Sequence, residues 1–305
     1  RPRLQQPIFV GLRGLTNMLE CGTTNPEPAQ TVQKTATRFD PRRVYTVLLA
    51  VPLLYAAIFY LPPIAFTCIV AVAGSLSLFE LYRVCLRPSA QPLAMGIGLV
   101  GCLALIVGPH YPIMVQPSLL VALLATLSIP LLVKMPFHES LKEGALTMTG
   151  LLYIGLTLSY LVMIRLLPQG EWFLLFLLLV TWAGDTAAYY VGTLCGQHVL
   201  APRISPKKTI EGLVGGLLGA VIFAYVAHWW FLSDFSAVDC IVLPVLLTFA
   251  GLWGDLAESA IKRSVGVKDS GSLLPGHGGM LDRLDSLLFT GPAFYYYVTL
   301  IGSHP

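Results

Sequence analysis

Five of the sixteen acidic residues of this 305-residue chain lie in one stretch, residues 254–286, together with four basic residues. Asp255 and Glu258 are three residues apart, so on a helix their carboxylates share a face and repel each other unless a cation lies between them. Asp282 and Asp285 repeat this spacing. Mg²⁺ commonly binds one or two carboxylates and completes its shell with water and phosphate oxygens. The stretch therefore predicts a magnesium site formed by these four carboxylates.

The same stretch allows a second interpretation, in which its carboxylates pair with Lys262, Arg263 and Arg283 in a salt-bridged loop. This interpretation explains the charges but not the glycines on both sides of His277. Glycines let a backbone approach a ligand closely, although the PGHGG sequence lacks the spacing of a P-loop. No second His or Cys lies near His277 in the sequence to form a zinc site, so we expect it to donate a hydrogen bond or shape a turn.

A second polar stretch runs from Asp185 to Glu211. Asp185 lies within an apolar segment, where a carboxylate is costly and usually faces a polar cavity; the alternative is a hydrogen bond between packed helices. Lys207 and Lys208 precede Thr209, which we expect to cap the next helix. Because the amides of a helix start favour anions, the two lysines are candidates for binding phosphate groups. Alternatively, they are topological charges near anionic lipid headgroups.

The surrounding sequence is strongly apolar. It is 55% hydrophobic and only 11% charged, with a mean hydropathy of +0.73, values typical of multi-span membrane proteins. The net charge of +3 falls mostly in loops and does not indicate nucleic acid as a partner. We predict an all-α polytopic membrane protein with about nine transmembrane helices, whose cytoplasmic polar loops form the site. A polar N-terminal arm, residues 1–43, precedes a membrane catalytic domain, residues 44–305.

The nine predicted spans are each close to the ~20 residues that a helix needs to cross the hydrocarbon core. They cover about 44–62, 63–82, 93–109, 114–133, 146–167, 171–195, 212–232, 237–261 and 284–302. Three glycines of the seventh span, Gly215, Gly216 and Gly219, are expected to allow close helix packing.

The loops between these spans alternate between basic loops and loops without Lys or Arg. By the positive-inside rule, the basic loops, which include both polar stretches, face the cytoplasm. The N-terminus is then inside and the C-terminus outside. We expect an integral protein of a bacterial inner (cell) membrane whose active site faces the cytoplasm.

Carboxylates for a divalent metal, basic groups for phosphates and a glycine-rich loop favour phosphoryl or nucleotidyl transfer onto a lipid. The HExxH, GxSxG and GxGxxG patterns are absent from the sequence, so zinc protease, serine hydrolase and Rossmann enzymes lose support. A CTP-dependent lipid kinase would use similar metal and phosphate groups. A multi-span transporter or channel would also place carboxylates within its spans, and it predicts a water-filled route across the membrane.

The acidic stretch resembles the signature of the phosphatidate cytidylyltransferases, also called CDP-diacylglycerol synthases. Twelve positions agree in order and spacing across twenty-seven residues: Ser259, Lys262, Arg263, Lys268, Asp269, Gly271, His277, Gly278, Gly279, Asp282, Arg283 and Asp285. The ISPKKTIEG segment and the segment around Asp185 also resemble this family. The similarity spans roughly residues 180–290.

This resemblance implies an Mg²⁺-dependent transfer of CMP from CTP to phosphatidate within the lipid bilayer, giving CDP-diacylglycerol and pyrophosphate in phospholipid biosynthesis. The implied catalytic residues are Asp255, Asp282, Lys262 and Arg263, with Asp255 and Asp282 holding the metals. The implied substrate-binding residues are Asp185, Lys207, Lys208, Ser259, Lys268, Asp269, His277, Gly278, Gly279 and Arg283. The attacking phosphate is already anionic, so no general base is required. The sequence is also compatible with a homodimer.

Overall fold

The computed structural model describes residues 51–267, 271 and 279–301. Contacts divide the chain into two units, Arg1–Thr35 and Ala36–Pro305, and all described residues belong to the second. The predicted polar arm, residues 1–43, lies outside the described residues, as does the beginning of the first predicted span. The division at residue 43 therefore stays a prediction.

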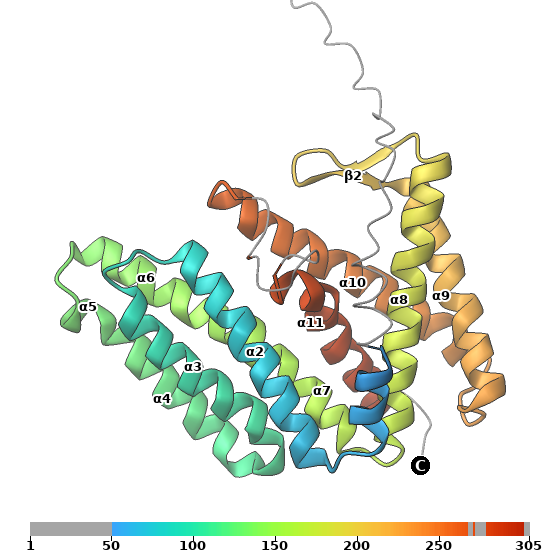
Figure 1. The fold of residues 1–305 in the computed structure, drawn as a ribbon, viewed down its shortest axis with the longest axis horizontal. Helices are drawn as coiled ribbons and strands as arrows, with labels where there is room; N and C mark the ends of the chain where they lie inside the picture. Colours follow the sequence, from blue (N-terminus) through green and yellow to red (C-terminus); the bar gives the residue numbers. More distant parts are fainter. Residues whose placement is uncertain (1–50, 268–270, 272–278, 302–305) are drawn as a thin grey trace, which may run out of the picture. The chain divides into compact units, whose positions relative to one another are not determined.

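Helices make up most of the described chain (Figure 1). Residues 51–59 are helical. The helices that follow are α2 (Pro63–Cys85), α3 (Gln91–Val107), α4 (Val115–Leu127), α5 (Ile129–Leu132), α6 (Phe137–Gly150), α7 (Thr157–Arg165), α8 (Gly170–Cys195), α9 (Ile210–Trp230), α10 (Asp239–Ser264) and α11 (Leu281–Tyr296). Two short 3₁₀ turns, η1 (Gly108–His110) and η2 (Pro112–Met114), lie between α3 and α4, and the π-helical segments η3 (Leu151–Leu156) and η4 (Tyr297–Ile301) follow α6 and α11.

Seven helical segments of the described chain are long and apolar enough to cross a membrane. They are Pro63–Cys85, Gln91–His110, Pro112–Leu132, Phe137–Arg165, Gly170–Cys195, Ile210–Trp230 and Asp239–Ser264, which correspond to the second to eighth predicted spans. The prediction of an all-α polytopic integral membrane protein is therefore confirmed.

The predicted number of nine spans is not confirmed. The first span lies partly outside the described residues. The ninth corresponds to α11 and η4, which do not belong to the seven apolar segments. Asp282, Arg283 and Asp285 in the first turns of α11 and three consecutive tyrosines at 295–297 lower its apolar character.

The fifth span begins earlier than predicted, at Phe137 instead of residue 146. Lys142, which falls in the basic loop between the fourth and fifth predicted spans, lies on this helix. The early turns are amphipathic: Glu143 is buried and accepts a hydrogen bond from the backbone N–H of Arg87 at 3.2 Å. Contact with the connection that follows α2 therefore accompanies a helix in a polar sequence that hydropathy assigned to a loop.

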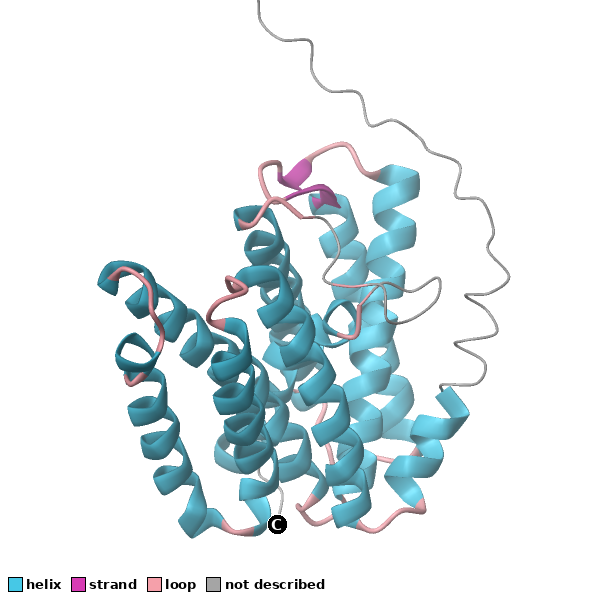
Figure 2. Ribbon diagram, turned by 60° about the vertical axis from the view of Figure 1, so that its left-hand side comes forward, coloured by secondary structure: helices cyan, strands magenta, loops and turns pink. Residues whose placement is uncertain are grey.

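The predicted polar loop after α8 contains a β-hairpin, which Figure 2 shows in magenta at one end of the helices. Strand β1 (Val199–Ala201) pairs antiparallel with β2 (Ser205–Thr209). The Thr209 hydroxyl accepts from the Gly212 N–H at 3.1 Å, so its predicted role as helix cap is confirmed. Glu211 Oε1 lies 2.6 Å from His198 Nδ1. The first turn of α9 thus holds both sides of the hairpin.

Small residues bring the helices around the site into close contact. Gly215, Gly216 and Gly219 of α9 pack against Val191, Ala188 and Ala187 of α8, which confirms their predicted packing role. A Cβ added at Gly254 of α10 would clash with the Asp285 carbonyl oxygen of α11. These contacts place the acidic ends of α10 and α11 side by side.

Candidate active site

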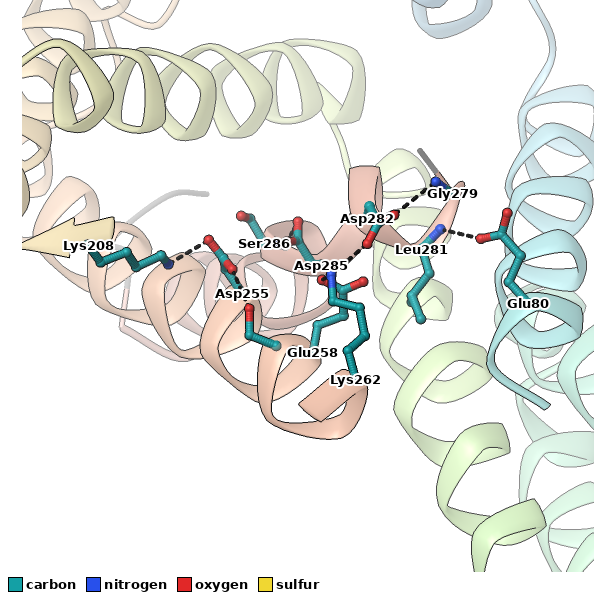
Figure 3. Close-up of polar contacts among 11 residues, drawn as sticks. Glu80, Lys208, Asp255, Glu258, Lys262, Gly279, Leu281, Asp282, Asp285 and Ser286 are labelled. Carbon is teal, nitrogen blue, oxygen red and sulfur yellow. Dashed lines mark hydrogen bonds and ion pairs between the residues drawn. The ribbon is translucent and has the colours of Figure 1, made fainter. Parts of the chain in front are cut away.

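The carboxylates predicted to act together come from α10 and the start of α11. Asp255 and Glu258 lie on α10, and Asp282 and Asp285 lie in the first two turns of α11. Figure 3 shows Lys208 next to Asp255, and Lys262 next to Glu258 and Asp282. The close contact at Gly254 explains this arrangement, because it lets the two helix backbones approach at the level of these residues.

Glu258, Lys262 and Asp282 form one group, which we call the Lys262 cluster. Lys262 Nζ lies 2.8 Å from Glu258 Oε2 and 2.6 Å from Asp282 Oδ1. The Glu258 side chain is only 2% exposed and that of Lys262 is 15% exposed. The other carboxylate oxygen of Asp282 accepts from the Gly279 N–H at 2.8 Å. The ammonium group between the two carboxylates offsets their repulsion.

Lys208 and three carboxylates form a second group, the Lys208 cluster. Lys208 Nζ, on β2, lies 2.5 Å from Asp255 Oδ2, whose side chain is 36% exposed. Electrostatic interactions link Asp185 of α8 and Asp285 of α11 to both Lys208 and Asp255. The Ser259 hydroxyl donates to Asp255 Oδ1 at 3.3 Å. The hairpin therefore brings a lysine to carboxylates from three helices.

The remaining predicted substrate-binding and catalytic residues divide into two groups. Lys207, Arg263 and Arg283 are described and exposed, on β2, α10 and α11 respectively. Four others lie outside the described residues: Lys268, Asp269, His277 and Gly278. Their predicted roles stay predictions.

The predicted magnesium site has suitable donors, which in this structure face lysines. Within the described part of the chain, no three His, Cys, Asp or Glu residues lie close enough together to hold a metal ion. Instead, Asp255 contacts Lys208, while Glu258 and Asp282 contact Lys262. Glu258 Oε1 is buried without a hydrogen-bond partner among the described residues. A buried oxygen of this kind and hard carboxylate ligands are chemically suited to Mg²⁺.

Two residues near this site, Glu80 and Tyr153, were not among those predicted from the sequence. Glu80 of α2 is 5% exposed and accepts a hydrogen bond from the Leu281 N–H at 3.1 Å. The hydroxyl group of Tyr153, in η3, is buried and has no hydrogen-bond partner among the described residues. The available signal for Glu80 was a carboxylate within a predicted span, 63–82, which usually marks a functional residue. Tyr153 gave no such signal, because tyrosines are common in membrane helices.

Comparison with known proteins gives a family match and several similar relatives. A family model described as "Cytidylyltransferase family" matches residues 41–301. The phosphatidate cytidylyltransferase of Bacillus subtilis (strain 168) is 35% identical over 270 residues, which cover 85% of this chain and 97% of the relative. The phosphatidate cytidylyltransferase of Staphylococcus aureus (strain COL) is 38% identical over 204 residues, covering 64% of this chain and 76% of the relative.

A third relative, the uncharacterized protein YnbB of Escherichia coli (strain K12), is 42% identical over 146 residues. That match covers 46% of this chain and 49% of the relative. The resemblance predicted from twelve residues thus extends over most of the described structure. It is confirmed, and the chain belongs to the cytidylyltransferase family.

Proposed function

We propose that this protein transfers CMP from CTP to phosphatidate and produces CDP-diacylglycerol and pyrophosphate for phospholipid biosynthesis. A phosphate oxygen of phosphatidate bonds to the α-phosphorus of CTP, and the bond from that phosphorus to the oxygen bridging to the β-phosphate breaks. The observation that carries the proposal is the convergence of carboxylates from α10 and α11 on two lysines. The family match and the names of the relatives support the nucleotide and the lipid.

The lysines and arginines are assigned to the phosphate groups. Lys208 reaches the site from β2 and Lys262 from α10, so cations approach from two directions. Arg263 and Arg283 are exposed beside them and contact the triphosphate or the lipid phosphate. Such fixed positive charges stabilise the negative charge that develops on phosphate oxygens during transfer. Ser259 orients Asp255 through its hydrogen bond.

The carboxylates are assigned to Mg²⁺. Asp255, Glu258, Asp282 and Asp285 would hold the metal, which would neutralise charge on the phosphates. Lys208 and Lys262 now compensate the same carboxylates. Both lysines can therefore turn toward substrate phosphates when another cation faces the carboxylates.

Pyrophosphate release tests this function directly. Purified protein in detergent is given phosphatidate, Mg²⁺ and, in turn, CTP, dCTP, ATP or GTP. We expect release with a cytidine nucleotide that requires both the lipid and the metal, and CDP-diacylglycerol as the lipid product. Omission of phosphatidate, addition of EDTA and the variant Asp255→Asn serve as controls.

The same assay separates the alternatives. A CTP-dependent lipid kinase would form CDP and a phosphorylated lipid from a lipid alcohol, with no pyrophosphate. A transporter or channel would release pyrophosphate with none of the nucleotides. Either result from folded protein would contradict the proposed transfer.

We also propose that the hairpin end of the helices faces the cytoplasm of a bacterial cell. The support is the charge of that end, where Arg203, Lys207 and Lys208 lie between α8 and α9, whereas the connection from α9 to α10 contains no Lys or Arg. In spheroplasts, a membrane-impermeant thiol reagent should label Ser233→Cys and not Arg203→Cys, in a background without other cysteines. Labelling at position 203 and not at position 233 would show the opposite orientation. A homodimer stays a prediction.

A further inference from the structure

Glu80 is a buried carboxylate that no step of the proposed transfer uses. It lies on α2, far from the signature in sequence, and its Oε2 accepts a hydrogen bond from the Leu281 N–H at 3.1 Å. Figure 3 shows this contact on the side of the Lys262 cluster that faces α2. Burying a carboxylate is costly, so a specific interaction has to stabilise it there.

The first interaction caps a helix. Leu281 is the first residue of α11, so its N–H has no acceptor within the helix. Met280, at the N-cap position, provides no side-chain hydrogen bond. Glu80 supplies the missing acceptor from a different helix, and its negative charge is favourable at the positive end of the helix dipole. It thereby determines where α11 begins, one residue before Asp282.

The second interaction involves the signature segment itself. A Cβ added at Gly271 would lie 2.7 Å from Glu80 Oε1 and 2.9 Å from its Cδ. The three atoms nearest to that Cβ all belong to Glu80. The backbone at Gly271 therefore passes directly against the carboxylate, and the glycine at this signature position is explained by the proximity of Glu80.

Glu80 also borders the Lys262 cluster. A cavity of ≈ 10 Å³ is lined by Glu80, Glu258, Lys262 and Leu281, with apolar residues of α2 and α10 around them. This volume is close to the minimum for one water molecule, so the side chains around it have little room to move. A shift of Glu80 would therefore displace Lys262 or the start of α11.

We propose that Glu80 is a positioning residue for the transfer reaction. It holds the backbone at Gly271 and at Leu281, and so sets the separation between Asp282 of α11 and Lys262 of α10. This inference rests on the proposed function. It assigns α2, a helix outside the signature, a direct part in arranging the site.

Steady-state kinetics of variants at position 80 test this role. Glu80→Ala should lower kcat roughly 10- to 100-fold and leave the KM for CTP within about threefold, because the groups are misplaced rather than lost. Glu80→Gln keeps an acceptor oxygen and should recover part of kcat. The matched control is Glu143→Gln, which changes an equally buried carboxylate outside the site. A kcat for Glu80→Ala within about twofold of wild type, or an equal loss in the control, would overturn the proposal.

A double-mutant cycle gives a sharper test. Gly271→Ala should reduce kcat by roughly tenfold when Glu80 is present, and by less than about twofold when it is combined with Glu80→Ala, which removes the atoms that clash. Gly96→Ala is the matched control, because nothing lies within 4 Å of a Cβ added there. An equal cost of Gly271→Ala in both backgrounds would contradict the contact. If Glu80→Ala does not fold, Glu80→Asp withdraws the carboxylate and serves the same cycle.

Thermal unfolding of the same four proteins separates this inference from the proposed function, because it needs no enzymatic activity. Gly271→Ala should lower the midpoint of wild type, whereas the double variant should unfold at the same midpoint as Glu80→Ala. If the midpoints show this coupling but the wild-type protein has no transferase activity, the contact between Glu80 and Gly271 stands and the proposed function is rejected. If the wild-type protein is active but the midpoints show no coupling, Glu80 is not the residue that holds the backbone at Gly271.

Discussion

The Lys262 cluster and the Lys208 cluster contain the same kinds of groups but differ in burial and in origin. Lys262 and Glu258 lie one turn apart on the same helix, and their side chains are 15% and 2% exposed. Lys208 comes from a strand, and it and Asp255 are 24% and 36% exposed. Removing one partner of a buried ion pair leaves an uncompensated charge, whereas a partly exposed pair contributes little to stability.

This difference in burial separates two tasks, which are shaping the site and binding the substrates. The Lys262 cluster joins α10 to α11, so it is needed for the shape of the site as well as for the reaction. The Lys208 cluster joins the hairpin to the helices and remains accessible to substrates. Substitutions in the first should therefore change stability and activity together, and those in the second should change activity or binding alone.

The largest effect is expected for Lys262→Met. It leaves Glu258 and Asp282 facing each other without a cation, so the free energy of unfolding should fall by roughly 3–5 kcal/mol and turnover should be lost. Unfolding in detergent and pyrophosphate release measure the two effects. Adding Glu258→Gln removes the excess negative charge and should restore much of the stability but no turnover. If Lys262→Met is as stable as wild type, the Lys262 cluster does not differ from the Lys208 cluster in its contribution to stability.

Asp255→Asn should have a large effect on turnover alone. The amide keeps the shape of the side chain but is a poorer ligand for Mg²⁺, so kcat should fall by roughly 10²–10³-fold. Because the pair with Lys208 is partly exposed, the free energy of unfolding should change by less than about 1 kcal/mol. Near-normal turnover in a Mg²⁺ titration would remove Asp255 from the proposed metal ligands.

Lys208→Ala should have an intermediate effect. Loss of one charge-assisted hydrogen bond to a phosphate raises the KM for CTP or phosphatidate by roughly 10- to 100-fold, with unchanged stability. Lys208→Arg, which keeps the charge, should lie between the variant and wild type. Unchanged KM values for both substrates would show that Lys208 only compensates Asp255.

The smallest effect is expected for the neighbouring lysine. Lys207 is exposed on β2, so Lys207→Ala should change the KM for phosphatidate by less than about fivefold. The effect should become smaller at high salt, because exposed charges are screened. An increase in KM as large as that of Lys208→Ala would show that Lys207 contributes as much to substrate binding as Lys208.

The sequence was sufficient to predict the fold class, because hydropathy and span length depend on local composition. It predicted seven segments to within a few residues at most ends, as for 212–232 against Ile210–Trp230. It was wrong where polar residues continue a helix, as at Lys142, and where the polar loop forms a hairpin. In both places tertiary contacts, which a hydropathy window does not include, determine the local structure.

The sequence indicated which residues are candidates for the site better than it indicated which of them contact each other. Asp255 and Glu258 lie on α10, and Asp282 and Asp285 lie at the start of the neighbouring α11. That they hold one metal stays a prediction. The pair of Glu258 with Lys262 follows from their i,i+4 spacing on α10. The contacts of Lys208 with Asp255 and of Lys262 with Asp282 join different elements, so spacing did not predict them. Glu80 was missed since its partner, Leu281, is two hundred residues away in the chain and contributes a backbone N–H, which leaves no trace in a side-chain pattern.

The two close glycine contacts lead to different expectations for how the family varies. Gly271 faces a side chain, Glu80, so a relative with alanine at the position of Gly271 should carry a shorter residue at that of Glu80. Gly254 faces the backbone carbonyl oxygen of Asp285, which every amino acid possesses. No substitution on α11 can make room there. The first pair is therefore expected to coevolve, whereas Gly254 should be invariant for as long as α10 and α11 keep this contact.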